Sequence, residues 1–284
     1  MRKFFDDPVY RRHPLQVLRA IWYGFFPPRG DAEASLTWGK PLVVDGEIGE
    51  GLYLLKRGVA QLSVTEACMR LARPGGTVID VGANQGVMTS AFVQELSSGD
   101  TVYSYEPHPT TFSYLQRNME AMKGEGSPVL IPKNKALSSE AGTITLFVPD
   151  EEKTRSWASL EENRAGEGVL EVDVEAVTLD DEIHDRVQVM KLDVEGHEHK
   201  VLEGGQELLR REKIKHIIFE NHEIEDSRTA DILLENGYDI KSLRRSKKGV
   251  ALIDEIDKTR TDFVATLYPE ECSGLLQEDG WRCI

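Results

Sequence analysis

A short apolar segment of the chain is followed at once by side chains that bind protons and metal ions. In the stretch "MKLDVEGHEHK" (190–200), Asp193, Glu195, His197 and Glu198 lie within six consecutive positions. Carboxylates and an imidazole at this spacing can serve as a general base, or they can bind a divalent metal ion. They can also be strand-end acids that are favoured at the N-terminus of a following helix.

A glycine-containing turn forms the second group of residues with chemical potential. The stretch "VIDVGANQGVMTS" (78–90) is typical of a strand, a turn and a helix, with Asp80 at the strand end and Gly82 and Gly86 in the turn. Glycine lets a ligand approach the backbone closely, and the start of the helix presents N–H groups that have no helical partner. The Gly-x-Gly-x-x-Gly spacing of dinucleotide-binding proteins is absent.

Two carboxylates indicate the charge of the ligand at this turn. Asp80 would repel a pyrophosphate, whereas it suits a cofactor that carries positive charge. Glu106 ends the next predicted strand, where an acid is placed to accept hydrogen bonds from both hydroxyls of a ribose. S-adenosylmethionine carries a sulfonium and an ammonium group and no phosphate, so these residues favour it over NAD.

A single sheet can bring these groups together. Apolar segments with strand character alternate with helical segments along most of the chain. Buried strands separated by helices imply an α/β fold with a doubly wound, mostly parallel sheet of seven strands. Its parallel strands would place Asp80, Glu106, Asp193 and Glu220 at one edge. The segments predicted as strands are 77–82, 101–107, 128–132, 187–194, 213–221, 238–243 and 261–267.

Several motifs occur in order along the chain and together resemble the FkbM-type S-adenosylmethionine-dependent methyltransferases. They are "IDVGANQGVMTS", "VYSYEPHPTTFSYLQRN", "NKALSSEAGTITLF", "VTLDD" and "MKLDVEGHEHKVLEGG", followed by "IIFE". The resemblance runs from about Pro41 to about Tyr238. It implies a Rossmann-like class I methyltransferase fold. It also implies methylation of an oxygen on a small molecule, very often a sugar or polyketide hydroxyl.

We predict the cofactor site from the glycine turn, the acid of the second strand and the segments that follow. Asn134, Lys135 and Ala136 are included because the resemblance places the adenine beside them. Gln85 and Thr89 are included because the start of the helix lies near the carboxylate of the cofactor. The predicted cofactor-binding residues are Asp80, Gly82, Ala83, Asn84, Gln85, Gly86, Thr89, Glu106, Pro107, Asn134, Lys135, Ala136 and Asp193.

Methyl transfer to an alcohol needs a base, because the alcohol must lose its proton as it attacks the methyl group in line with the sulfur. Three interpretations of the acidic cluster stay open. The first is a base with its orienting groups, formed by Asp193, Glu195, His197 and Glu220. The second is a divalent metal site at the same four residues, which the resemblance does not require. In the third, Asp193 holds the cofactor and the other acids only favour a helix N-terminus.

Another region breaks the alternation of strands and helices. The segments 142–148 and 168–179 have the pattern of antiparallel strands, so we predict an insert over 142–179. A long polar stretch separates them. It is either a lid, with Trp157 as a platform for the substrate, or a plain surface loop.

The net charge of the chain narrows the range of possible substrates and binding partners. The 284 residues carry a formal net charge of −15, which disfavours binding along a nucleic-acid backbone. We therefore rank an O-methyltransferase that acts on a small molecule or glycan above an RNA methyltransferase. A non-catalytic protein that binds S-adenosylmethionine is the remaining alternative. Cys68, Cys272 and Cys283 are scattered, which indicates free thiols in a reducing compartment such as the cytoplasm. No apolar run reaches the roughly 18 residues of a membrane-spanning helix.

The N-terminus differs from the rest of the chain in charge. Residues 1–30 contain six Lys or Arg and two Asp, a net charge of +4, which leaves −19 for the remainder, and they also contain seven aromatic residues. We expect a basic, aromatic arm over 1–40 and a methyltransferase domain over 41–284, with short strands or a hairpin at 41–56. We predict that the N-terminal extension is helical with a hairpin. The arm is either a helix that packs its aromatic side on the domain or on a partner subunit of a homodimer, or it binds weakly to a membrane surface and brings the enzyme to lipid-linked substrates.

Overall fold

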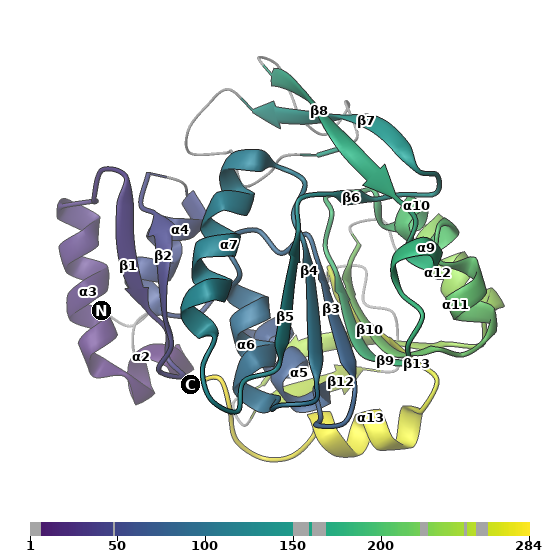
Figure 1. Ribbon diagram of the computed structural model, residues 1–284. Helices are drawn as coiled ribbons and strands as arrows, with labels where there is room; N and C mark the ends of the chain where they lie inside the picture. Colours follow the sequence, from purple (N-terminus) through teal and green to yellow (C-terminus); the bar gives the residue numbers. More distant parts are fainter. Residues whose placement is uncertain are drawn as a thin grey trace.

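The computed structural model describes residues 7–47, 49–149, 159–160, 169–221, 227–246, 249–253 and 261–284. Its centre is a sheet of eight strands in the order β12-β11-β13-β10-β9-β3-β4-β5 (Figure 1). The strands are β3 (Thr77–Val81), β4 (Thr101–Tyr105), β5 (Val129–Lys133), β9 (Val187–Leu192), β10 (Ile214–Glu220), β11 (Asp239–Arg245), β12 (Val250–Ile253) and β13 (Asp262–Thr266).

The predicted doubly wound, mostly parallel sheet is confirmed. The five neighbouring strands β10, β9, β3, β4 and β5 pair in parallel. β13 is antiparallel to both β10 and β11. All seven predicted strands are present. One further strand, β12, pairs with β11 as a hairpin at the edge of the sheet.

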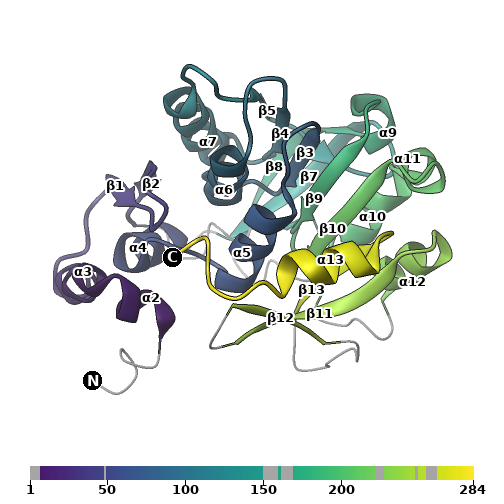
Figure 2. The ribbon, with the colours of Figure 1, turned by 90° about the horizontal axis from the view of Figure 1, so that it is seen from below.

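Helices cover both faces of the sheet, as the alternating pattern requires. One hydrophobic cluster lies under α5 (Leu62–Leu71), α6 (Val87–Glu95), α7 (Pro109–Met122) and α13 (Pro269–Leu276). A second cluster lies on the other face, under α9 (Leu179–Glu182), α10 (Glu198–Glu203), α11 (Gln206–Arg210) and α12 (Arg228–Glu235). Figure 2 shows these two layers on either side of the strands.

The insert forms a small separate sheet. Its order is β6-β8-β7, made of β6 (Ala136–Leu137), β7 (Gly142–Pro149) and β8 (Val169–Val177), and β7 pairs with β8 in the predicted antiparallel manner. Most of the predicted lid, including Trp157, lies outside the described residues. Within that stretch, Ser159 forms an antiparallel β-bridge with Phe147. The Ser159 hydroxyl donates a hydrogen bond to the backbone oxygen of Glu195 (2.8 Å).

The predicted helical and hairpin character of the N-terminal extension is confirmed. The extension contains α2 (Pro8–Arg12), α3 (Pro14–Phe25), a hairpin of β1 (Asp31–Ser35) with β2 (Pro41–Asp45), and α4 (Gly49–Arg57). The prediction of strands over 41–56 holds only for β2. Its partner is the preceding β1, and the glycine-rich stretch that follows forms a helix, because Gly51, Leu54 and Leu55 at i, i+3 and i+4 are buried on one side.

The hairpin spans the boundary that we expected between residues 40 and 41. The C-terminal tail returns to the same region, where the Arg12 guanidinium donates to the backbone oxygens of Trp281 and Ile284. Within the described residues, no helix is long and apolar enough to cross a bilayer.

Candidate functional site

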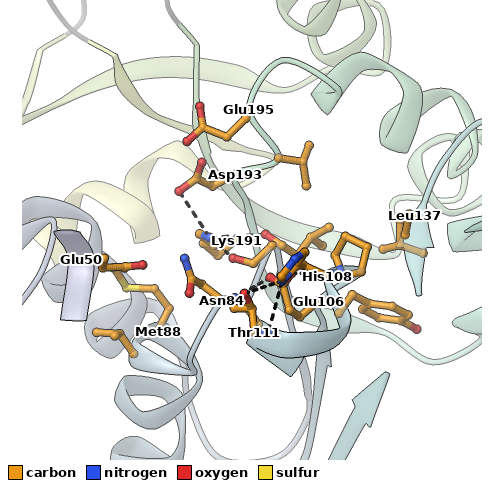
Figure 3. A pocket seen from close by; sticks show the side chains of 18 of the residues that line it. Glu50, Asn84, Met88, Glu106, His108, Thr111, Leu137, Lys191, Asp193 and Glu195 are labelled. Atoms are coloured by element: carbon orange, nitrogen blue, oxygen red, sulfur yellow. Dashed lines mark hydrogen bonds and ion pairs between the residues drawn. The ribbon is translucent and has the colours of Figure 1, made fainter. Parts of the chain in front are cut away.

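A cavity of about 620 Å³ lies at the carboxyl edge of the central sheet. Its walls come from the turns after β3, β4 and β9, from the start of the insert, and from α4 of the N-terminal extension (Figure 3). In open α/β sheets, ligands bind at this edge, where the strand order changes direction. Here that point lies between β3 and β9.

Glu106 is fixed at the end of β4 and faces the cavity (Figure 3). One carboxylate oxygen accepts the backbone N–H of Asn84 and the other accepts the backbone N–H of His108, both at 2.9 Å. Only 8% of the residue is exposed, and burial raises the pKa of Glu106 to about 7 although both hydrogen bonds oppose the rise. Each oxygen keeps a further lone pair, so this carboxylate can accept two ribose hydroxyls.

The glycines in the turn after β3 are needed for packing of the chain itself as well as for close approach of a ligand. Gly82 lines the cavity with φ of +71°, and a Cβ atom at this position would lie 1.9 Å from the backbone oxygen of Asp193. The β3 turn therefore packs directly on the end of β9, which only glycine permits. Gly86, with φ of +95°, is the N-cap of α6 and does not line the cavity.

Asp80 lies behind the turn and does not line the cavity. It is fully buried, and one of its oxygens accepts the Thr89 hydroxyl at 2.6 Å. The Lys191 ammonium lies 3.8 Å from the other oxygen, donates to the backbone oxygen of Gly82 (2.9 Å), and reaches Asp193 at 3.4 Å. Asp80 is therefore a partner of a buried cation in the wall, and any effect of its charge on a ligand acts through that cation.

Lys191 is one lining residue that the sequence did not predict. It occupies β9 with 4% of its surface exposed, and burial disfavours its ammonium form. The charges of Asp193 and Asp80 outweigh that cost and raise the pKa of Lys191, so it stays protonated at neutral pH. The pKa of Asp80 is raised by burial, and Lys191 opposes that rise. A lysine inside an otherwise apolar strand was the available signal.

The predicted cofactor residues divide into two sets. Those that line the cavity are Gly82, Ala83, Asn84, Glu106, Pro107, Lys135, Ala136 and Asp193. Those that lie behind its wall are Asp80, Gln85, Gly86, Thr89 and Asn134. Two of the second set hold backbone in place: Gln85 accepts the N–H of Asp45 (2.8 Å), and the amide of Asn134 donates to the backbone oxygens of Glu106 and Pro107.

The predicted catalytic residues divide in the same way. Asp193 and Glu195 line the cavity beyond the end of β9. The chain does not stay extended between them, because Glu195 has φ of +54° and Gly196 has φ of +106°. Glu198, at the start of α10, accepts the N–H groups of Val194 and Gly196 and so holds this tight turn. A non-glycine residue in the left-handed region, supported by a neighbouring side chain, is typical of functional sites.

Glu220 and His197 lie outside the cavity wall. Burial raises the pKa of Glu220 to about 8, and the nearby charges of Asp193, Asp262 and Glu195 add to the rise. Glu220 is therefore close enough to the two lining carboxylates to interact with them. His197 is buried, with Nε2 at 3.0 Å from the Ser138 hydroxyl. In the part of the chain that the structure describes, no three His, Cys, Asp or Glu side chains are arranged to hold a metal ion.

The N-terminal extension supplies residues to the cavity that no motif predicted. Glu50 of α4 faces the cavity opposite Asn84 (Figure 3), and burial raises the pKa of Glu50 to about 7 against the opposing charge of Lys191. Gln61 donates its amide hydrogen bond to Asp193 at 3.3 Å. Tyr53 lines the same wall. These positions become recognisable only once α4 is seen to pack beside the β3 turn.

The charges around the cavity still favour a cationic ligand. Among the described lining residues, four carry carboxylates and two carry ammonium groups: Glu50, Glu106, Asp193 and Glu195 against Lys135 and Lys191. The excess of negative charge agrees with the electrostatic argument from the sequence. It comes from the lining acids, however, and not from Asp80.

The doubly wound, mostly parallel sheet with a cavity at its carboxyl edge is the predicted Rossmann-like α/β fold. The family follows from the sequence: residues 80–240 match the family model described as the methyltransferase FkbM domain, and the chain belongs to this family. The predicted resemblance is therefore confirmed.

Two proteins with similar sequences are named as methyltransferases. Methyltransferase 1 of Beauveria bassiana (strain ARSEF 2860) is 30% identical over 146 residues, which cover 45% of this chain and 57% of that protein. Methyltransferase sdnD of Sordaria araneosa is 28% identical over 197 residues, covering 57% of this chain and 73% of that protein. The chain thus spans little more than half the length of the first relative.

Solved structures were also compared. The crystal structure of a methyltransferase FkbM from Methylobacillus flagellatus KT aligns with a TM-score of 0.43 at 15% identity, covering 75% of this chain and 52% of that one. A SAM-dependent O-methyltransferase from Thermotoga maritima aligns with a TM-score of 0.40 at 13% identity, covering 72% and 63%.

Proposed function

We propose that the protein transfers a methyl group from S-adenosylmethionine to a hydroxyl oxygen of a small molecule or glycan. The observation that supports this most strongly is the Glu106 carboxylate, buried at the end of the second strand of the parallel core and facing the cavity with both oxygens held by backbone N–H groups. It suits a ribose, while the surrounding acids suit a cationic group and disfavour a phosphate.

In this proposal, different residues of the cavity contact different parts of the cofactor. Glu106 accepts the ribose hydroxyls, and the turn from Gly82 to Asn84 supplies close backbone contact. Pro107, Lys135 and Ala136 line the part that we assign to the adenine. When bound, S-adenosylmethionine supplies a methyl group attached to a cationic sulfur. The lining acids favour that positive charge.

We assign the proton-accepting role to Asp193 or Glu195, because they are the predicted catalytic residues that line the cavity. Asp193 is held by Lys191 and Gln61, so its carboxylate has a fixed direction. Glu220 and His197 would act as positioning residues from behind the wall. We expect Asp193→Asn or Glu195→Gln to lower turnover by about 10²–10⁴-fold, the usual contribution of a general base. Unimpaired turnover in both variants would remove the assignment.

An acceptor screen tests the proposed substrate class. The full chain is incubated with methyl-labelled cofactor and with free sugars, sugar nucleotides, glycosides and bulk RNA as separate acceptors. We expect label on a carbohydrate or other small hydroxyl compound. Robust incorporation into RNA would replace the proposal with an RNA methyltransferase. Calorimetric binding of S-adenosylhomocysteine without turnover on any acceptor would indicate a non-catalytic binding protein.

We also propose that the protein works in a reducing compartment such as the cytoplasm. The three cysteines, Cys68, Cys272 and Cys283, are all buried free thiols. Burial raises the pKa of each thiol, which keeps it protonated and unreactive at neutral pH.

A further inference from the structure

Helix α3 presents large apolar side chains to the solvent. Six of the eleven exposed large hydrophobic side chains in the described part of the chain lie between positions 15 and 26, and they are 48–78% exposed. They are Leu15, Leu18, Ile21, Trp22, Phe25 and Phe26. Leu15, Leu18, Trp22 and Phe25 follow at spacings of three, four and three residues, so they form one stripe along the helix. We call these six residues the α3 apolar face.

The opposite side of α3 is covered by the rest of the N-terminal extension. Gln16 is 5% exposed and donates to the backbone oxygen of Ser35, and α3 packs with its inner side against α4. A helix of a globular protein normally buries its apolar side and exposes its polar side. On α3 the inner side holds Tyr23, which packs against the hydrophobic core, and the larger apolar side chains face the solvent. Figures 1 and 2 both place α3 at the outer flank of the molecule, beyond α4.

Basic residues accompany this face. Residues 8–29 contain Arg11, Arg12, Arg19 and Arg29 and no Asp or Glu. Arg11 and Arg29 are exposed at the two ends of the helical segment, whereas Arg12 is bound to the C-terminal tail. The chain outside the first 30 residues carries −19. A local positive charge on an acidic protein fits a surface that is itself negative.

Two partners could cover the α3 apolar face: a second copy of this chain or a membrane surface. The charge of the arm distinguishes between them. In a twofold dimer the same surface of both subunits meets, so two basic arms would face each other. A bilayer with anionic lipids offers the opposite charge together with an apolar interior. Trp and Phe beside Arg are typical of helices that lie in the plane of a membrane surface. With 12 residues, α3 is about 18 Å long, too short for the roughly 30 Å hydrocarbon core.

We propose that α3 is a membrane-docking helix that lies flat on a bilayer containing anionic lipids, with the α3 apolar face in contact with the acyl chains. α4 separates this face from the cavity and carries Glu50 and Tyr53 to the cavity wall. Docking therefore takes place one helix away from the candidate site. It does not depend on the proposed methyl transfer.

Vesicle co-sedimentation of the full chain tests the proposal. We expect binding to phosphatidylcholine vesicles that contain phosphatidylglycerol, and weaker binding to phosphatidylcholine alone. Trp22→Ala combined with Phe25→Ala should lower the partition coefficient at least about tenfold, because two exposed aromatic side chains lose their burial in the bilayer. The matched control is Leu170→Ala with Leu234→Ala, which removes two exposed apolar side chains elsewhere and should leave partition unchanged.

Two further variants separate the contributions of charge and contact. Arg11→Glu with Arg29→Glu should abolish the preference for anionic vesicles. Trp22→Phe should retain binding but lose the blue shift of tryptophan fluorescence that accompanies insertion of the indole. Because the side chains of Arg11, Trp22, Phe25 and Arg29 are exposed, the thermal unfolding midpoints of these variants should match that of the wild type.

Three outcomes would overturn the proposal. They are no partition of the wild type into either kind of vesicle, equal partition of the Trp22→Ala/Phe25→Ala variant, and a wild-type dimer that this variant converts to a monomer without any lipid binding. The last outcome would identify the α3 apolar face as an interface between two copies. Calorimetric binding of S-adenosylhomocysteine, measured on every variant, keeps these results separate from a failure of the proposed function.

Discussion

The cavity has one wall made of strand ends between Val81 and Glu195, and another made of residues 49–61 in the N-terminal extension. The first wall lies almost entirely within the FkbM match at 80–240. Glu106 in this wall is held by backbone N–H groups, and Asp193 lies beside the buried ammonium group of Lys191. The second wall lies outside that match. It reaches the cavity through side chains of α4 and the turn after it, including Glu50 and Tyr53.

The two walls therefore hold their side chains in different ways. A carboxylate held by two backbone N–H groups cannot change its direction without a change in the sheet, so it suits a ligand that is always the same. Side chains on a packed helix can be exchanged without disturbing strands. We infer that the strand-end wall holds the cofactor and that the α4 wall contributes to acceptor binding.

Lys191→Met should be the most damaging change in the strand-end wall. The variant leaves Asp80 and Asp193 without their shared cation, and Asp80 is fully buried. Removing one partner of a buried ion pair typically costs about 3–5 kcal/mol, because the remaining charge stays desolvated. We expect a loss of this size in the apparent free energy of unfolding, measured by urea titration and followed by circular dichroism.

A second substitution shows whether that loss is electrostatic. Lys191→Met combined with Asp80→Asn removes the unpaired buried charge and should recover part of the stability. If the double variant were no more stable than Lys191→Met alone, the buried pair would not be what holds this wall together.

Glu106→Gln should weaken the binding of S-adenosylhomocysteine about 10- to 100-fold, since a hydrogen bond to a charged group contributes roughly 1.5–3 kcal/mol. The affinity of the wild type should also depend on pH. The pKa of Glu106 is raised to about 7 in the free protein, and ribose hydroxyls bind the carboxylate form. Affinity should therefore be constant above about pH 7 and fall by up to about tenfold per unit below it.

Calorimetry of three proteins assigns this pH dependence. Glu106→Gln should remove it. Glu50→Gln should retain it, although burial also raises the pKa of Glu50 to about 7. If the dependence disappeared in Glu50→Gln and persisted in Glu106→Gln, the ribose would not lie where we place it, and the α4 wall would hold the cofactor.

The sequence predicted two acids of the strand-end wall because each of them lies at the end of a predicted strand. Glu106 and Asp193 were found in this way, since parallel strands bring their carboxyl ends to one edge. The burial of Asp80 could not be predicted, because it depends on Lys191 from a strand more than a hundred residues later. A cation that crosses from one strand to its neighbour leaves no periodic pattern.

The α4 wall was missed for another reason. The stretch 41–56 was predicted to form short strands or a hairpin, whereas Gly51 lies in α4 and is required because a Cβ atom there would meet the backbone oxygen of Asp45 at 1.9 Å. The residues of this wall are brought to the cavity by packing of α4 against α3 and the β1–β2 hairpin. Such long-range placement does not appear in local spacing. Whether the lid prediction around Trp157 is correct is not tested by the described residues.

Glu220→Gln should stabilise the protein at alkaline pH. The pKa of Glu220 is raised from 4.5 to about 8, first by burial and then by Asp193. Between these two values the folded protein holds a proton that the unfolded chain releases, so the wild type loses stability as pH rises through this window. The variant lacks this loss. We expect it to unfold at higher urea concentration near pH 8.5, with a gain of about 1–2 kcal/mol, a value reduced for partial solvation, and no gain near pH 5.

Glu203→Gln is the control of opposite sign. A hydrogen bond from Lys200 lowers the pKa of Glu203, so the contribution of Glu203 to stability is present above the unfolded pKa and is lost in acid. This variant should be slightly less stable than the wild type at neutral pH and equal to it in acid. Stabilisation of both variants at pH 8.5 would point to a general effect of removing negative charge from an acidic protein.

Tyr53→Ala should have the smallest effect on the cofactor. The Tyr53 ring lines the α4 wall and stacks against the Arg57 guanidinium, 5.2 Å from the ring centroid, at a site with 43% of the residue exposed. If the division between the two walls holds, S-adenosylhomocysteine should bind this variant within about threefold of the wild type, which corresponds to roughly 0.6 kcal/mol. Once an acceptor is known, its KM should rise while the affinity for the cofactor stays constant. A tenfold loss of cofactor affinity in Tyr53→Ala, with the unfolding midpoint unchanged, would show that both walls hold the cofactor. The acceptor would then have to be sought on the side of the insert, where Leu146 and Leu160 line the cavity.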